Sequence, residues 1–414
     1  MVENMDNKKK LTKEEKRNFI SILTIATLFF VVMLFVNVFL VARIFYITNE
    51  NFVAIGLFVI MQASGMFLSY FSTSVFCKKY KPVYVTRLLA VLSIVFLVML
   101  YLFQEYLGSY YMLFGLCWGL IFGIYAGSTN LMIARLFKAK GSHNFVTWRK
   151  MARGGVSILF PFTLGLLIDL GSFTMSIVVV GVISVMLVIA TIFVRYPKEQ
   201  STKLQPIKYF HAMRDNGATR QTMSLWFICL MATSFNMLSY FTTMLIILSI
   251  GSNIGLGAMH SVIGAVGILS LFAYHKSPKS IKTKMFWFSA VVPFLVSLIL
   301  FFDVNITLVI IFFFLTSFKN IVSAEEMPLR MNATKFWGGE EFMVESNIFL
   351  ELPAFLGKVI GGTCIIIVGL VGPTTFMLAG MVSAILFIFY IHAVMVFFWK
   401  RKYVYKTPAT QIES

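Results

Sequence analysis

Stretches of about twenty apolar residues recur along the whole chain, and each is long enough to cross a lipid bilayer as a helix. Of the 414 residues, 59% are hydrophobic and only 13% are charged, whereas a soluble domain carries roughly 25% charged residues. We therefore predict an all-α integral membrane protein with twelve spans, at 19–46, 52–76, 87–104, 110–136, 154–172, 174–195, 224–250, 253–274, 285–302, 305–329, 347–371 and 374–399.

The basic residues are confined to alternate loops. Of the 35 lysines and arginines, 32 fall on one side of the predicted spans, together with the N-terminal segment. The short connections on the other side contain neither residue type; they lie around Asn49, Glu105, Gly171, Ser252, Asp303 and Gly372. The positive-inside rule then places both termini in the cytoplasm. Because the net charge of +18 is spread over several short segments, it is a topology signal, and we expect no nucleic-acid partner.

The longest polar break lies at 196–223, contains Pro197, Pro206 and Gly217, and divides the spans into six and six. Such a break is typical of a linker. We predict a cytoplasmic tail over 1–18, a six-helix bundle over 19–195, a cytoplasmic linker over 196–223, a second bundle over 224–399 and a cytoplasmic tail over 400–414.

The two halves echo each other in sequence. The run from Phe160 to Ile168 in the fifth span is similar to the run from Leu352 to Ile360 in the eleventh, with Pro161 matching Pro353 and Gly165 matching Gly357. Weaker matches occur in the same order between the first and seventh spans and between the second and eighth. Parallel repeats of this kind are found in one large class of transporters.

Twelve spans, the 6+6 division, inside termini and parallel repeats together resemble the major facilitator superfamily. The resemblance implies two six-helix bundles around a central cavity, with the third, sixth, ninth and twelfth spans at the periphery. In that family the loop after the second span usually carries an acidic residue, but this chain has Cys77 about there. The polar residues agree with the implied arrangement, because the four peripheral spans hold few of them.

Charged groups within the bilayer cost several kcal/mol unless they are paired or hydrated, so they are candidates for function. Lys319 and Lys358 lie about halfway along the tenth and eleventh spans. Each has an acid seven residues away, Glu326 and Glu351, which is about two turns and nearly the same helix face. Glu325 adds a further acid. These residues predict a lysine layer that attracts an anionic substrate and a carboxylate layer that exchanges protons.

Neutral groups complete the predicted site. Asn37, Gln62, Asn236, Tyr240 and Asn320 are candidates for hydrogen bonds to the same ligand. The competing interpretation is that the lysines and acids form buried ion pairs that only fix helix packing.

Two further features lie elsewhere in the spans. Arg43 and Asp169, near the outer ends of the first and fifth spans, are candidates for an extracellular gate formed by pairing. Glycines 115, 119, 123 and 127 form a stripe that predicts close packing against a neighbouring helix.

The favoured function is secondary active transport of a small anionic or zwitterionic organic solute by alternating access, coupled to protons as symport or antiport. The alternatives are export of amphiphilic drugs or lipids, and a receptor or scaffold that transports nothing. No sequence motif of a hydrolase, metalloprotease or nucleotide-binding enzyme is present, so we expect no enzymatic activity, no metal and no cofactor. The expected setting is a monomer among membrane lipids in a bacterial inner membrane.

Overall fold

The computed structural model describes residues 13–136, 139–195, 205–236, 238–299, 306–326, 342–372 and 375–401. Within these ranges every regular element is a helix, as predicted. Eleven of the helical stretches are long and apolar enough to cross a membrane. Each of them covers most of one of the spans that the sequence predicts.

The first half of the chain forms α1 (Lys13–Leu34), the π-helix η1 (Phe35–Leu40), α2 (Val41–Ile47), α3 (Phe52–Lys79), α4 (Pro82–Leu102), the short η2 (Gln104–Tyr106), α5 (Leu107–Leu136), α6 (Ala139–Leu170) and α7 (Phe173–Ile192). The second half forms α9 (Thr219–Asn236), α10 (Leu238–Ile250), α11 (Asn253–Lys276), α12 (Lys279–Ile299), α13 (Ile306–Thr316), α15 (Met343–Val371) and α16 (Thr375–Trp399).

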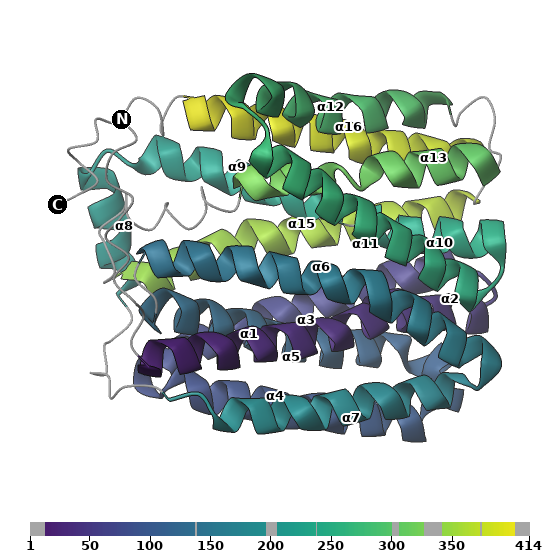
Figure 1. The fold of residues 1–414 in the computed structure, drawn as a ribbon, viewed down its shortest axis with the longest axis horizontal. Helices are drawn as coiled ribbons and strands as arrows, with labels where there is room; N and C mark the ends of the chain where they lie inside the picture. Colours follow the sequence, from purple (N-terminus) through teal and green to yellow (C-terminus); the bar gives the residue numbers. More distant parts are fainter. Residues whose placement is uncertain are drawn as a thin grey trace.

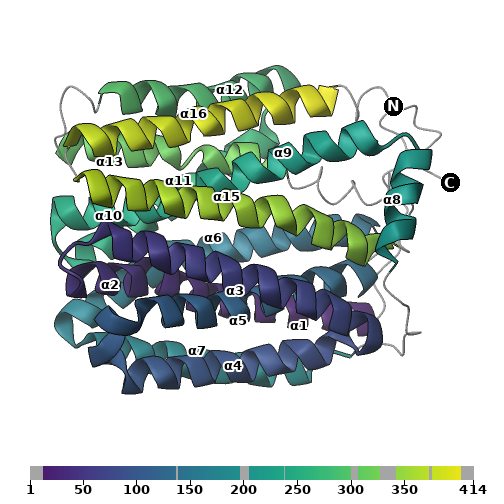
Figure 2. The same ribbon diagram turned by 180° about the vertical axis from the view of Figure 1, so that it is seen from behind.

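The long helices run roughly parallel and fill one bundle (Figures 1 and 2). In both views α4 and α7 lie at one edge and α12 and α16 at the opposite edge. These four helices are the third, sixth, ninth and twelfth spans, which the resemblance places at the periphery. Large apolar side chains on them face outward, among them Val95 and Val182, as a lipid-facing surface requires.

One predicted span is corrected, and the predicted linker contains a helix. The tenth predicted span, 305–329, is not one continuous helix, because α13 ends at Thr316 and a turn precedes a second helical segment over 319–326. The predicted linker 196–223 contains the helix α8 (Pro206–Asp215), and α9 already begins at Thr219. The side chains of Tyr209 and Met213 on α8 are buried, and Figure 1 shows α8 across one end of the bundle. Burial of two apolar residues explains why this polar segment folds.

The two halves meet along two seams of close backbone contact. In the first, α6 packs on α11, where a Cβ on Gly257 would lie 2.2 Å from the carbonyl oxygen of Pro161. In the second, α3 packs on α15, where a Cβ on Gly56 would lie 2.7 Å from the carbonyl oxygen of Gly362. Small residues permit this approach. The seams therefore bring side chains of both halves next to one another.

The glycine stripe of α5 packs on α3, which confirms the prediction of close packing. A Cβ on Gly119 would lie 2.1 Å from the carbonyl oxygen of Gln62, and one on Gly123 would lie 2.2 Å from that of Met66. We expect Gly119→Ala to lower the free energy of unfolding by about 1–3 kcal/mol through overpacking. Gly155→Ala is the matched control, because a Cβ there meets nothing within 4 Å. Equal melting temperatures for the two variants in detergent would contradict the expectation.

Candidate functional site

The first span changes its helical type halfway along its length. Between α1 and α2 the backbone forms the π-helix η1, and Asn37 lies within it. π-Helical turns are rare and are found mostly at functional sites. Asn37 is thereby placed on a locally widened turn, with its side chain partly buried.

Three of the predicted neutral residues form one hydrogen-bonded cluster. Gln62 on α3 donates from Nε2 to Asn37 Oδ1 at 3.3 Å. The hydroxyl of Tyr240, on α10 in the second half, donates to Gln62 Oε1 at 2.7 Å and lies 3.5 Å from Asn37 Oδ1. This cluster joins the two halves through side chains that a polar ligand is able to compete for. All three residues were predicted from the sequence as hydrogen-bonding partners of the ligand, but their contacts with one another were not predicted.

Lys319 follows a break in its span. The hydroxyls of Thr316 and Ser317 both donate to the carbonyl oxygen of Phe313, each at 2.9 Å, and such side-chain bonds compete with the helical ones. The ammonium nitrogen of Lys319 lies 5.5 Å from the ring centre of Phe235 on α9. Within the described residues, no ion pair joins Lys319 to a carboxylate. A cation held mainly by an aromatic face retains hydrogen-bonding capacity for an anion.

Lys358 reaches from α15 into the first half. Its ammonium nitrogen contacts the sulfur of Met66 on α3 and lies 5.6 Å from the ring centre of Phe122 on α5. Met66 is one turn from Gln62 on the same helix face. The lysine is therefore close to the Asn37–Gln62–Tyr240 cluster, which the sequence alone did not indicate.

Glu326, which follows Lys319 by about two helical turns, is buried against a histidine. Glu326 Oε2 lies 3.3 Å from His392 Nε2, and the two side chains are 9% and 2% exposed. His392 lies on the peripheral helix α16. A carboxylate and an imidazole are therefore in direct contact inside the second half.

The other two predicted acids have different surroundings. Glu325 accepts a hydrogen bond from the Tyr274 hydroxyl on α11 and pairs with Lys400 beyond the end of α16. It therefore ties three elements of the second half together. Glu351 on α15 is half-buried, two turns from Lys358.

At the other end of the bundle, the Asp169 carboxylate binds the N-terminal end of the helix α11. Its Oδ1 accepts from Asn253 Nδ2 at 2.7 Å and its Oδ2 accepts from the backbone N–H of Ile254 at 2.8 Å. Asp169 belongs to α6 and Ile254 to α11, so these bonds cross between the halves. The predicted partner, Arg43, instead lies 5.7 Å from the ring centre of Phe173. A carboxylate at a helix N-terminus is favoured by the helix dipole.

We expect Asp169→Ala to lower the free energy of unfolding by about 1–2 kcal/mol, because it removes a capping carboxylate from α11. Asp215→Ala is the control, since Asp215 is exposed on α8 and pairs with its neighbour Arg214. Thermal melting of the two variants in detergent measures the difference. A loss as large for Asp215→Ala as for Asp169→Ala would contradict the assignment.

The remaining candidates are placed as follows. Asn236 ends α9, but its side chain lies outside the described residues. Asn320 packs against α11, where a Cβ on Gly267 would lie 2.3 Å from Asn320 Nδ2. The structure thus brings Asn37, Gln62 and Tyr240 together, with Lys358 nearby.

Sequence reasoning missed three features of this region. They are the π-helix around Asn37, the pairing of Glu326 with His392, and the contact of 3.3 Å between Thr243 Oγ1 and His260 Nε2. A histidine on an otherwise apolar span was the only signal for the second and the third. No sequence signal marked the π-helix.

Comparison with protein-family models and with curated protein sequences gives no match. Solved structures do match over nearly the whole chain. A bacterial homologue of the human lysosomal transporter Spinster has a TM-score of 0.66 and 14% identity, covering 97% of this chain and all of that one. The human organic anion transporter MFSD10 has a TM-score of 0.66 and 13% identity, covering 92% of this chain and 100% of that one.

The POT family transporter PepTSo has a TM-score of 0.67 and 11% identity, covering 96% of this chain and 99% of that one. Such likenesses, at low identity but over more than nine tenths of the chain, establish the fold.

Proposed function

Because the chain has the fold of the major facilitator transporters, we propose that it is a secondary active transporter of a small anionic or zwitterionic organic solute. It works by alternating access and couples transport to protons. The proposal includes twelve spans, both termini in the cytoplasm and a place in a bacterial inner membrane. The similar solved structures support it, because they include a human organic anion transporter and a POT family peptide transporter.

Support for the orientation comes from the positive charges. The start of α1, the helix α8 and the end of α16 lie at the same end of the bundle (Figure 1). That end carries Lys16, Arg17, Arg195, Lys208 and Arg214. An excess of lysine and arginine marks the cytoplasmic side.

One observation carries the substrate class: the Asn37–Gln62–Tyr240 cluster bridges the two halves, and Lys358 reaches across to a neighbouring turn of α3. A ligand with a carboxylate meets a cation there, and its other polar atoms meet an amide or a hydroxyl. When such a ligand bonds to both halves, it favours the state in which they close around it.

Proton coupling is supported by Glu326 and His392. The two side chains form a buried pair. Glu326 follows Lys319 by seven residues, which is about two helical turns. Protonation of the carboxylate removes a negative charge from the region, so the region attracts an anionic substrate more strongly. Proton binding and substrate binding are then linked.

The test is uptake by purified protein in proteoliposomes with an imposed inward pH gradient. The probes are a labelled amino acid, a dipeptide, a monocarboxylate, a dicarboxylate and a nucleoside, with an amphiphilic cationic dye for export. We expect uptake of at least one charged organic probe, and its collapse when a protonophore is added. Movement of the dye alone, or of no probe, would overturn the proposal.

A further inference from the structure

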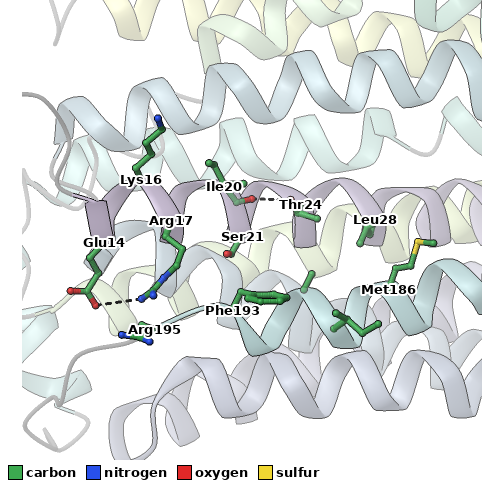
Figure 3. A pocket seen from close by; sticks show the side chains of 12 residues that line it. Glu14, Lys16, Arg17, Ile20, Ser21, Thr24, Leu28, Met186, Phe193 and Arg195 are labelled. Carbon is green, nitrogen blue, oxygen red and sulfur yellow. Dashed lines mark hydrogen bonds and ion pairs between the residues drawn. The ribbon is translucent and has the colours of Figure 1, made fainter.

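A groove of about 1020 Å³ lies between the first turns of α1 and the last turns of α7, on the outside of the first half (Figure 3). It does not include any of the residues proposed to bind the transported solute. Its walls are Ile20 and Leu28 on α1 and Met186 on α7, with Phe193 just beyond the end of α7. Ile20, Met186 and Phe193 are each more than half exposed. The groove is therefore open to whatever surrounds the bundle.

Charge and apolar surface are separated along this groove. Lys16, Arg17 and Arg195 line the end of the groove that lies at the start of α1. Leu28 and Met186 line the end toward the middle of the bundle (Figure 3). Leu28 follows Lys16 by twelve positions, which is about 18 Å along the helix. That length is close to half of the hydrocarbon thickness of a bilayer, about 15 Å. The groove thus has the polarity and the length of one phospholipid in one leaflet.

The cationic end is built into the structure by buried bonds. The buried side chain of Asn18 donates from Nδ2 to the carbonyl oxygen of Arg195 at 2.9 Å, and its Oδ1 accepts from the N–H of Arg195 at 3.0 Å. These two bonds fix the chain beyond α7 to α1. Because they hold the backbone of Arg195, its side chain is placed at the mouth of the groove. The guanidinium takes no part in these two bonds and remains available to a ligand.

Arg17 lies at the same place, with 37% of its side chain exposed. Its Nη2 lies 3.9 Å from Glu14 Oε1, which is a weak ion pair. The groove is lined by three cationic side chains, Lys16, Arg17 and Arg195, and by one carboxylate, Glu14. This excess of positive charge favours an anionic ligand over a zwitterionic one. Guanidinium groups suit phosphate oxygens in particular.

We propose that this groove binds an anionic phospholipid of the cytoplasmic leaflet. Its phosphate is held by Arg17 and Arg195, and one acyl chain lies against Ile20, Leu28 and Met186. The side of the membrane rests on the orientation given under the proposed function. The binding itself is independent of any transported solute.

The test is native mass spectrometry of the purified protein with added phosphatidylglycerol or phosphatidylcholine of the same acyl chains. We expect phosphatidylglycerol to be retained in preference, and Arg195→Gln to reduce that preference about ten-fold, as for loss of a hydrogen bond to a charged group. Fold is preserved in this variant because Asn18 binds only the backbone of residue 195. Glu14→Gln is expected to strengthen retention. Arg214→Gln, an exposed cation on α8, is the matched control.

Two further arms separate the head group from the chain. Inorganic phosphate and glycerol phosphate, added at the same concentration, are expected not to displace the lipid. Ala190→Trp fills the apolar part of the groove and is expected to weaken retention of both lipids. Equal retention of the two lipids by the unmodified protein, or equal loss in Arg195→Gln and Arg214→Gln, would overturn the proposal. Because no transport is measured, these outcomes leave the proposed function untouched.

Discussion

Replacing Lys319 with methionine is expected to lower solute uptake about 10- to 100-fold, because a hydrogen bond to a charged group is worth about 1.5–3 kcal/mol. The protein is expected to remain folded. Methionine is similar in length and flexible, and the recorded contact of the ammonium group is with the ring of Phe235. Uptake of the solute identified in proteoliposomes measures the first effect, and thermal melting in detergent measures the second.

Lys276→Met is the matched control for this substitution. The ammonium nitrogen of Lys276 also lies over an aromatic ring, 4.4 Å from the centre of Phe272, but at the end of α11. Uptake by Lys276→Met is expected to equal that of the unmodified protein. If Lys319→Met lost its folded state together with its uptake, the lysine would be part of the packing, as the competing interpretation of the sequence holds.

Glu326→Gln is expected to abolish the response of uptake to a pH gradient while exchange of solute across the membrane continues. Glutamine keeps the size of the side chain and is able to bond to His392, but it has no titrating proton. The driving force is then lost, whereas binding and alternation of the two halves are retained. Counterflow in preloaded proteoliposomes measures exchange, and uptake with and without the gradient measures coupling.

Glu105→Gln provides the control for coupling, because Glu105 is exposed in the connection before α5. A gradient response that persisted in Glu326→Gln would remove this carboxylate from the proton path. Loss of both exchange and coupling, with intact melting, would assign it to solute binding instead.

The sequence predicted the spans well because apolar length and charge asymmetry decide which segments enter a membrane. It failed at the tenth span, where the apolar run continues past Thr316 and Ser317 but the helix α13 ends at Thr316. The hydroxyls of both residues bond to the carbonyl oxygen of Phe313 at that point. It also treated 196–223 as a polar linker. The burial of Tyr209 and Met213, which folds α8, depends on contacts with distant helices.

The candidate site was predicted as a set of residues, not as an arrangement. Polar side chains are costly within a bilayer, so Asn37, Gln62 and Tyr240 stood out by type alone. Their hydrogen bonds depend on how α10 packs against the first half, which no local pattern encodes. His392 lies on a peripheral helix and was overlooked for that reason, although it contacts the buried Glu326.

Chemical rescue of Lys319→Cys measures the central claim most directly. In a background without Cys77, Cys117, Cys229 and Cys364, this variant is expected to be inactive in uptake. Aminoethyl methanethiosulfonate attaches an amine through a disulfide and is expected to restore uptake, whereas the neutral methyl reagent is not. Restoration requires both a positive charge at this position and water access to it. Failure of the charged reagent to react, or recovery with the neutral one, would contradict a solute site that includes Lys319.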